Sequence, residues 1–168
     1  MLVDDFSSLE LVSKLGTRWL GVSDQVMGGV SEAGVARTVV ARRNCLRLTG
    51  DVRLENNGGF IQAACDLDRE GGSLDLSGYA GLRLGVRGDG ERYSVHLRTP
   101  DNTRPWQSYR GHFIAEANWA EVSLPFKAFV PHRIDLPLDI SRLRRIGLVA
   151  IGRAFRADLA VCKIAFYR

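Results

Sequence analysis

The sequence has no segment of the kind that inserts into a membrane or directs secretion. No stretch approaches the ~18–20 consecutive apolar residues that a membrane-spanning helix needs. The first residues include Asp4 and Asp5, and they lack the basic and apolar regions that open a secretory signal. We therefore expect a soluble, cytoplasmic protein that does not insert into membranes.

Cysteine is scarce as well. The three cysteines, Cys45, Cys65 and Cys162, are odd in number, far apart and outside any CxxC or Cys/His spacing that would bind a metal. Each lies in an apolar, strand-like run. These features indicate reduced, buried thiols rather than disulfides.

Lysine is rare although the chain is basic, with a formal net charge of +4. Only three of the 23 basic residues are lysine, and the rest are arginine. Such a skew is typical of bacteria with GC-rich genomes. The arginines are scattered singly between apolar residues, whereas a nucleic-acid interface requires a clustered basic stripe. We expect no nucleic-acid partner.

Residue patterns that carry catalysis are also missing. The three histidines, His96, His112 and His132, have no metal-ligand spacing, and no GxSxG nucleophile motif is present. Acidic residues are plentiful, but a sequence cannot show two of them facing each other across a cleft, as glycoside hydrolysis requires. An acidic loop could still hold a structural calcium ion, although no DxDxDG-type loop occurs. We therefore expect a non-catalytic protein without a cofactor.

Short alternation of apolar and polar residues dominates the chain. In segment 46–54, the residues Leu46, Leu48, Val52 and Leu54 face one side and polar residues face the other. Similar patterns predict strands at residues 35–41, 60–67, 81–87, 92–98, 106–115, 119–126, 146–152 and 159–167. The run at 146–151 is apolar on both faces, which predicts a central strand. Together these patterns indicate an all-β sandwich or barrel, and 168 residues predict one domain over 1–168.

Helix is expected at only two places. Residues 6–15 could form one or two helical turns, with Ser7 as the N-terminal cap and Glu10 completing a capping box. Residues 140–145 could add a further turn. The helices that a parallel α/β sheet needs for its crossovers are missing.

One hairpin can be predicted in detail. Asp89-Gly90 suits a type I′ turn, which would pair residues 81–87 with 92–98 and place their large apolar side chains on one face. The opposite face would then carry a cluster of basic residues: Arg83, Arg87, Arg92, His96 and Arg98. The repulsion between opposed arginines costs free energy unless neighbouring carboxylates, or an anionic or polyhydroxyl ligand, offset it. The alternative is a solvated outer face with internal ion pairs.

Segment 19–31 fits neither alternation nor an amphipathic helix. Ser23 and Asp24 can accept hydrogen bonds from nearby backbone N–H groups, and Gly28-Gly29 allows geometry that a Cβ would block. The phosphate-binding GxGxxG and GK[ST] patterns are missing. We expect a structured loop that closes one end of the sandwich.

Further polar and aromatic residues are candidates for ligand contact. Asn56 and Asn57 fit a hairpin turn with positive φ, or alternatively a pair of amides that bind sugar hydroxyls or a peptide backbone. Trp106 and Tyr109 could stack on a sugar ring, or they could belong to the core. Trp106 is the better candidate for exposure because it follows a polar, proline-containing loop.

Several motifs, in order along nearly the whole chain, resemble the complex I intermediate-associated protein 30 family. They are Trp19 with SDQVMGGVS at 23–31, LENNGGF at 54–60, RGDGERY at 87–93, Tyr109 with Phe113, and Trp119 with LPFKAF at 124–129. The resemblance implies a galactose-binding-like jelly roll, a two-sheet antiparallel β-sandwich similar in shape to some carbohydrate-binding modules. It also implies a role like that of the family's mitochondrial namesake, a chaperone-like factor in the assembly of respiratory complex I.

Two functions are expected for such a binding module. The first is protein interaction during assembly, in which the SDQVMGG and NNGGF loops and the basic face hold a partner such as respiratory-complex subunits. The alternative is a carbohydrate-binding module that uses the polar, arginine-bearing sheet face. The candidate binding residues are Ser23, Asp24, Asn56, Asn57, Gln62, Arg87, Asp89, Arg92, His96, Arg98, Trp106 and Tyr109.

Overall fold

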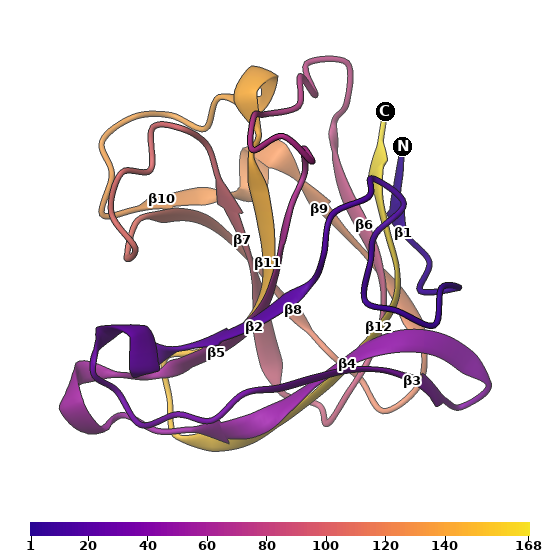
Figure 1. The fold of residues 1–168 in the computed structure, drawn as a ribbon, viewed down its shortest axis with the longest axis vertical. Helices are drawn as coiled ribbons and strands as arrows, with labels where there is room; N and C mark the ends of the chain where they lie inside the picture. The colour runs from indigo at the N-terminus through magenta and orange to yellow at the C-terminus, as the bar shows by residue number, and fades with distance from the viewer.

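The computed structural model describes residues 1–168 and consists of two six-stranded antiparallel sheets that face each other (Figure 1). The first sheet has the order β3-β4-β12-β6-β9, and β1 pairs with β12. Its strands are β1 (Leu2–Asp4), β3 (Gly34–Val40), β4 (Arg43–Val52), β6 (Gly81–Arg87), β9 (Ala120–Pro125) and β12 (Phe155–Tyr167). The predicted all-β, antiparallel two-sheet architecture is confirmed.

The second sheet has the order β10-β8-β7-β11-β5-β2. Its strands are β2 (Leu20–Ser23), β5 (Phe60–Asp66), β7 (Arg92–Arg98), β8 (Ser108–Ile114), β10 (Val130–His132) and β11 (Arg145–Ile151). The strand β11 lies at the centre of the sheet between β5 and β7, and its residues 146–150 are buried, as its apolar sequence predicted. The strands β1, β2 and β10 have only three or four residues, too few for alternation to reveal them.

The space between the sheets is filled by the side chains that alternation places inward. A cluster of 32 buried residues forms the hydrophobic core. Leu82 and Leu84 of β6 and Val95 and Leu97 of β7 are fully buried in it. Because each large apolar side chain buried in this way stabilises the fold by ~1.5–3 kcal/mol, the face that each strand presents to the core is strongly fixed.

The predicted hairpin between β6 and β7 is wrong. The strand β6 pairs with β12 and β9, whereas β7 pairs with β11 and β8, so segment 88–91 crosses from one sheet to the other. Gly90 has a positive φ of 80° but Asp89 does not, which excludes a type I′ turn. The Gly90 N–H instead donates to the carbonyl oxygen of Ala115 at 2.7 Å. Both strands turn apolar side chains toward the same core from opposite sides, a pattern that alternation cannot distinguish from pairing.

The helical turns predicted for residues 6–15 are absent. The Asp5 carboxylate accepts hydrogen bonds from the N–H and hydroxyl of Ser7, and the Ser8 hydroxyl accepts one from the N–H of Glu10. Side-chain acceptors that satisfy backbone donors locally compete with helix formation. The helical segments are four 3-10 turns, η1 (Asp24–Met27), η2 (Glu55–Asn57), η3 (Phe126–Ala128) and η4 (Ile140–Arg142). None has the length or apolar composition that a helix needs to cross a bilayer.

All three cysteines are free thiols. Cys45 and Cys65 are buried, as predicted, and Cys162 of β12 is half-buried. Burial raises the pKa of the Cys45 and Cys65 thiols. Both therefore stay protonated at neutral pH, where only a thiolate would be reactive.

Candidate functional site: a cleft on the second sheet

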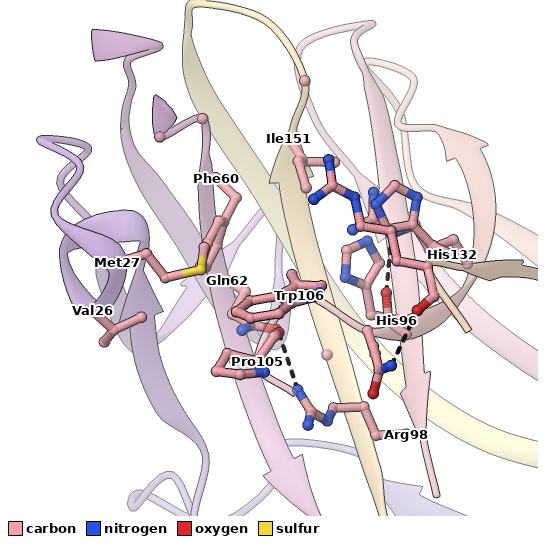
Figure 2. Close-up of a pocket in the computed structure, with 18 of the residues that line it drawn as sticks. Val26, Met27, Phe60, Gln62, His96, Arg98, Pro105, Trp106, His132 and Ile151 are labelled. Carbon is pink, nitrogen blue, oxygen red and sulfur yellow. Dashed lines mark hydrogen bonds between the residues drawn. The ribbon is translucent and has the colours of Figure 1, made fainter. Parts of the chain in front are cut away.

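A cleft of about 690 Å³ lies on the outer face of the second sheet (Figure 2). Side chains of β5, β7, β8 and β11 form its floor, and its rim comes from the segments around η1 and η2 and from residues 105–107. Its volume lies within the ~300–1,000 Å³ range that is typical of small-molecule sites. This cleft is the candidate binding site.

Gly147 of β11 lines the floor of the cleft and contributes no side chain to it. In the register of the sheet, Gly147 of β11 lies opposite His96 of β7. A Cβ on Gly147 would lie only 2.5 Å from the amide oxygen of Gln62 on β5. Ile146 and Leu148, on either side of this glycine, belong to the core, so Gly147 itself faces outward. The glycine gives the Gln62 and His96 side chains room in the cleft.

His96 has an unused hydrogen-bonding atom. Its Nε2 is buried and has no partner in the protein. Burial lowers the pKa of His96 well below the ordinary value of 6.5, and the positive charge of Arg110 lowers it further, so the ring is neutral at pH 7. Buried polar atoms are normally paired, and a neutral imidazole nitrogen can donate or accept. The Nε2 atom is therefore an unpaired polar group in the wall of the cleft.

Positive charge lines the cleft. No aspartate or glutamate lines it, whereas four arginines do: Arg98, Arg110, Arg133 and Arg145. The guanidinium of Arg98 donates to three carbonyl groups of the 102–105 loop at 3.2–3.3 Å, which fixes its position. Burial lowers the pKa of Arg98, and the nearby arginines of β11 and the segment before it lower it further. No group of three or more His, Cys, Asp or Glu side chains is arranged to hold a metal ion.

Trp106 supplies exposed aromatic surface at the rim. The residue is 45% exposed, and Figure 2 shows its ring over the centre of the cleft. Its loop is held by Gln107, whose side-chain oxygen accepts hydrogen bonds from the N–H groups of Thr103 and Arg104 at 2.9 and 3.1 Å. The Gln107 amide also donates to the carbonyl oxygen of Arg133 at 3.1 Å. The ring is thus presented by a loop with a defined conformation.

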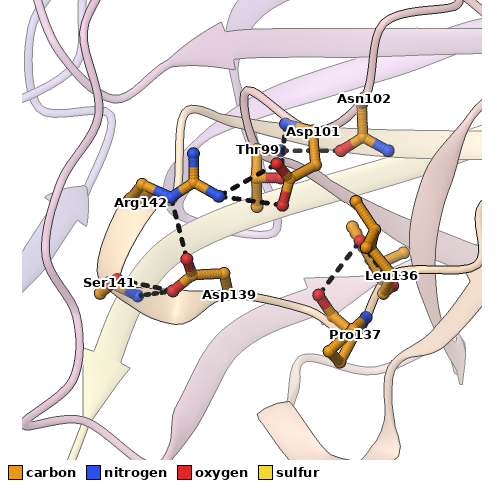
Figure 3. A network of polar contacts seen from close by, with 9 residues as sticks. Thr99, Asp101, Asn102, Leu136, Pro137, Asp139, Ser141 and Arg142 are labelled. Carbon is orange, nitrogen blue, oxygen red and sulfur yellow. Dashed lines mark hydrogen bonds and ion pairs between the residues drawn. The ribbon is translucent and has the colours of Figure 1, made fainter.

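A polar network joins this loop to the segment that follows β10 (Figure 3). The Arg142 guanidinium lies 3.0 Å from a carboxylate oxygen of Asp101 and 2.9 Å from one of Asp139. The hydroxyl of buried Tyr109 donates to the carbonyl oxygen of Leu136 at 2.8 Å. These contacts hold both segments of this part of the rim, so its shape is set without a ligand.

The rim around η1 and η2 is built on a buried carboxylate. Asp24 is fully buried and accepts hydrogen bonds from the N–H groups of Ser31 at 2.9 Å, Gly59 at 2.5 Å and Phe60 at 3.3 Å. Burial by itself would raise the pKa of Asp24, but the hydrogen bonds from the Ser31 hydroxyl and from these N–H groups outweigh it and hold the pKa below 3.8. A Cβ on Gly29 would overlap this carboxylate, which explains the glycine. Asp24 therefore ties the η1 loop to the start of β5.

The structure brings five of the sequence-predicted candidates together in the cleft: Asn57, Gln62, His96, Arg98 and Trp106. Their contact with a ligand remains a prediction. They come from η2, from the strands β5 and β7 on either side of β11, and from the loop before β8. The shared cleft makes them one candidate site.

Two further candidates, Ser23 and Asp24, have positions in which they stabilise the loop. The Ser23 hydroxyl caps η1 by accepting a hydrogen bond from the N–H of Gln25 at 3.3 Å, and Asp24 has the contacts described above. The predicted structured loop with side-chain acceptors is confirmed.

Asn56, with φ of 59°, is exposed beside the cleft. The predicted hairpin at this turn is wrong because β4 and β5 belong to different sheets.

The predicted single basic face does not exist. Arg87 lies on β6 in the first sheet, whereas His96 and Arg98 lie on β7 in the second, and Arg92 is exposed on β7 outside the cleft. This follows from the failure of the predicted hairpin, since only pairing of β6 with β7 would have joined these residues. The Asp89 carboxylate accepts a hydrogen bond from the hydroxyl of Tyr93 at 3.0 Å outside the cleft.

Tyr109 is a core residue, one of the two possibilities that the sequence left open for it. Its side chain is fully buried and only its hydroxyl reaches a polar partner. It therefore offers no ring face to a ligand in the cleft.

Several lining residues have no sequence signal that singled them out: Arg110, His132, Arg133, Arg145 and Gly147. Alternation around the inward Tyr109 places Arg110 outward on β8. Which outward side chains share a cleft depends on the strand order β8-β7-β11-β5, and this order joins residues far apart in the chain. A single sequence does not contain that information.

Comparisons with known proteins bear on the family and on the fold. The sequence model of the family described as complex I intermediate-associated protein 30 matches residues 5–161. No curated protein matches the chain.

Among solved structures, the similar ones include two families of carbohydrate-binding module from Clostridium thermocellum. The family 11 module of a cellulosomal cellulase has a TM-score of 0.74 at 13% identity, over 99% of this chain and 93% of that one. The family 11 module in complex with a β-1,3-1,4-mixed-linked tetrasaccharide has a TM-score of 0.73 at 13% identity, over 99% and 94%. The family 30 module of another cellulosomal cellulase has a TM-score of 0.67 at 17% identity, over 98% and 97%. These likenesses show the fold, and they confirm the predicted jelly roll.

Proposed function

The chain belongs to the complex I intermediate-associated protein 30 family, and from this premise we propose that it is a non-catalytic binding module whose ligand site is the cleft of the second sheet. The occupant that the geometry favours most is a carbohydrate. One observation carries this proposal: an exposed tryptophan, Trp106, lies over a polar floor that contains an unpaired buried nitrogen.

A sugar ring and this cleft have matching surfaces. A pyranose presents an apolar C–H face and an edge of hydroxyl groups. Trp106 offers a flat apolar surface to the first, and aromatic side chains of this kind combine large contact area with a polar edge. Gln62, Asn57 and the Nε2 of His96 offer donors and acceptors to the second. The tetrasaccharide complex of a module with the same fold supports the same ligand class.

The composition of the cleft supports binding rather than glycoside hydrolysis. That reaction uses a pair of carboxyl groups that flank the scissile bond, roughly 5–10 Å apart. No aspartate or glutamate lines the cleft. The one buried carboxylate near it, Asp24, is occupied by hydrogen bonds from its own loop.

Calorimetric titration with a panel of defined oligosaccharides tests this role. The panel contains cellotetraose, xylotetraose, a mixed-linked β-glucan tetrasaccharide and tetragalacturonate. We expect at least one to bind, and we expect Trp106→Ala to weaken that binding at least about tenfold, a loss of about 1.4 kcal/mol. The matched control is Trp119→Ala, because Trp119 lies beside β9 of the first sheet. If no member of the panel binds the wild type, the carbohydrate role is rejected. If both variants lose affinity equally, the placement of the sugar on Trp106 is rejected.

A second candidate is protein interaction during assembly of a larger complex, the role of the family's namesake. The specific observation in its favour is exposed apolar surface at the rim, where Val26 is 68% exposed and Met27 is 41% exposed. Adjacent exposed apolar side chains mark interaction surfaces more often than isolated ones do. A partner segment would cover them as it enters the cleft.

This second candidate is tested by affinity purification from the cells that make the protein. The tagged wild type is compared with a Val26→Ser/Met27→Ser variant and with Val39→Ser, which changes a 56% exposed valine on the first sheet. The assembly role is supported if respiratory-complex subunits are retained by the wild type and Val39→Ser and lost from the rim variant. Recovery of the same proteins with all three rules it out.

A further inference from the structure

Arginines on the two outer faces differ in their partners. On the first sheet, Arg47 makes two hydrogen bonds to the Asp158 carboxylate, at 2.7 and 2.9 Å. Among the cleft arginines, Arg145 contacts a carboxylate, that of Asp66 at 2.7 Å. The other three, Arg98, Arg110 and Arg133, contact none. The sequence left two possibilities open for its outward arginines, internal ion pairs or a ligand. Among those residues, Arg83 of the first sheet has an ion pair, with Glu121 at 3.8 Å, whereas Arg98 of the cleft has none.

Arg110 has donors that no protein group uses. Its Nε donates to the hydroxyl oxygen of Ser108 at 3.0 Å, but its two terminal nitrogens make no hydrogen bond or ion pair in the protein. Arg133 also lines the cleft, and its side chain makes no hydrogen bond or ion pair in the protein. Burial lowers the pKa of Arg110, and the charge of Arg133 lowers it further. The two guanidinium groups line the same cleft with like charge, which costs free energy unless an anion binds there.

The positive field extends to the histidines of the cleft. Burial lowers the pKa of His132, and the charges of Arg110 and Arg133 lower it further. The pKa of His96 falls for the same two kinds of reason. A neutral sugar would leave this field uncompensated, whereas an anionic substituent would offset it.

Building on the proposed carbohydrate-binding role of this cleft, we propose that its ligand is an anionic saccharide, a sugar that carries carboxylate, sulfate or phosphate groups. The sugar ring packs on Trp106, and the anionic group accepts hydrogen bonds from the free N–H donors of Arg110 and Arg133. Guanidinium groups suit this task because they bind carboxylate and phosphate through two parallel N–H bonds. Arg98 adds a fixed positive charge, since its donors are held by the 102–105 loop.

Titration calorimetry at low ionic strength separates the possible ligands. The acidic probes are tetragalacturonate, a sulfated tetrasaccharide and glucose 6-phosphate; the neutral probe is cellotetraose, and inorganic phosphate is the anion without a sugar. We expect the best acidic probe to bind at least about tenfold more tightly than cellotetraose, with an affinity that falls as salt is added. The best of the three identifies the substituent.

The outcomes distinguish this inference from the function on which it rests. If cellotetraose binds as tightly as the acidic probes, the anionic ligand is rejected while the carbohydrate role stands. If inorganic phosphate binds as tightly as the acidic sugars, the saccharide is rejected and only anion binding remains. If no probe binds, the anionic ligand is rejected, and the carbohydrate role depends on xylotetraose and the mixed-linked tetrasaccharide of the first panel.

Three single variants provide the structural test. Arg110→Gln and Arg133→Gln are each expected to weaken acidic-probe binding roughly tenfold, and to weaken cellotetraose binding much less. Arg87→Gln removes one charge from the first sheet and should leave both affinities at the wild-type value. Arg133 is exposed, so its variant keeps the fold, and melting curves of all three verify this. An equal loss in all three variants would mean a nonspecific charge effect and would overturn the proposal.

Discussion

Asp24 is a buried residue beside the cleft and His96 has a buried ring nitrogen in it, but the hydrogen bonding of the two differs. The Asp24 oxygens receive N–H groups from three residues of two loops. The Nε2 atom of His96 receives none. A satisfied buried group stabilises the fold around it, whereas an unsatisfied one costs stability and persists where another group uses it. The first residue is therefore structural, and the second belongs to the proposed ligand site.

Replacing Asp24 should destabilise the protein. Asp24→Asn puts an amide NH2 against backbone N–H donors, so at least one buried donor loses its acceptor. We expect the free energy of unfolding to fall by about 2 kcal/mol, measured by urea denaturation. Asp51→Asn is the control, since exposed Asp51 pairs with Arg156 at 3.3 Å and should change stability by less than about 0.5 kcal/mol. Equal effects of the two variants would contradict the structural role of Asp24.

His96 should make the stability of the protein depend on pH. Its pKa in the folded protein lies well below the value of 6.5 expected when unfolded. Below pH 6.5 the His96 ring is therefore protonated in the unfolded chain and neutral in the folded protein. As the pH is lowered, the free energy of unfolding falls by up to about 1.4 kcal/mol per pH unit. The loss continues down to the folded pKa. The charged and titratable groups that lower this pKa are Arg110, His112, His132 and Arg98.

Urea denaturation of the wild type and His96→Gln, between pH 7 and pH 5, measures this dependence. The variant should lose less stability than the wild type over that range. His112→Gln is the matched control, because exposed His112 should account for a smaller part of the slope. If the wild type and His96→Gln have the same slope, His96 is not held neutral by burial.

At the scale of the strand, β11 shapes the cleft because Gly147 has no side chain to fill it. Gly147→Ala would put a Cβ 2.5 Å from the Gln62 amide oxygen, at the end of a side chain that can move. We expect the free energy of unfolding to stay within about 1 kcal/mol of the wild type, because alanine suits a strand better than glycine. Ligand affinity should fall several-fold as Gln62 is displaced, measured by calorimetry with the best-binding oligosaccharide. Unchanged affinity would mean that the floor at Gly147 is not contacted.

The longer strands could be predicted, but the three shortest and the pairing of the strands could not. Alternation of apolar and polar residues fixed the face that β6 and β7 turn to the core, because one face of each strand is buried. It could not fix the neighbours of these strands, since both faced the same core from opposite sheets. The Asp89-Gly90 pair suggested a hairpin, yet tertiary contacts such as the Gly90 N–H to the Ala115 carbonyl determined the turn.

The same limit applies to the site at the scale of the whole molecule. Five candidates could be predicted as outward or loop residues, because alternation and turn composition are local properties. Arg87 was grouped with His96 by the false pairing, although the two sheets separate them. Arg110 and Gly147 join the cleft only through the order of strands, which depends on long-range contacts. The sequence therefore indicated a polar binding face without locating it.

The central claim is that the protein binds its ligand on the outer face of the second sheet. The most direct test is a series of 1H–15N correlation spectra of the labelled protein, titrated with the oligosaccharide that binds most tightly in calorimetry. We expect the largest shifts at the backbone amides of Gln62, His96, Arg110 and Gly147 and at the indole N–H of Trp106. Shifts that gather on the outer face of the first sheet, or at the 88–91 crossing, would contradict the account.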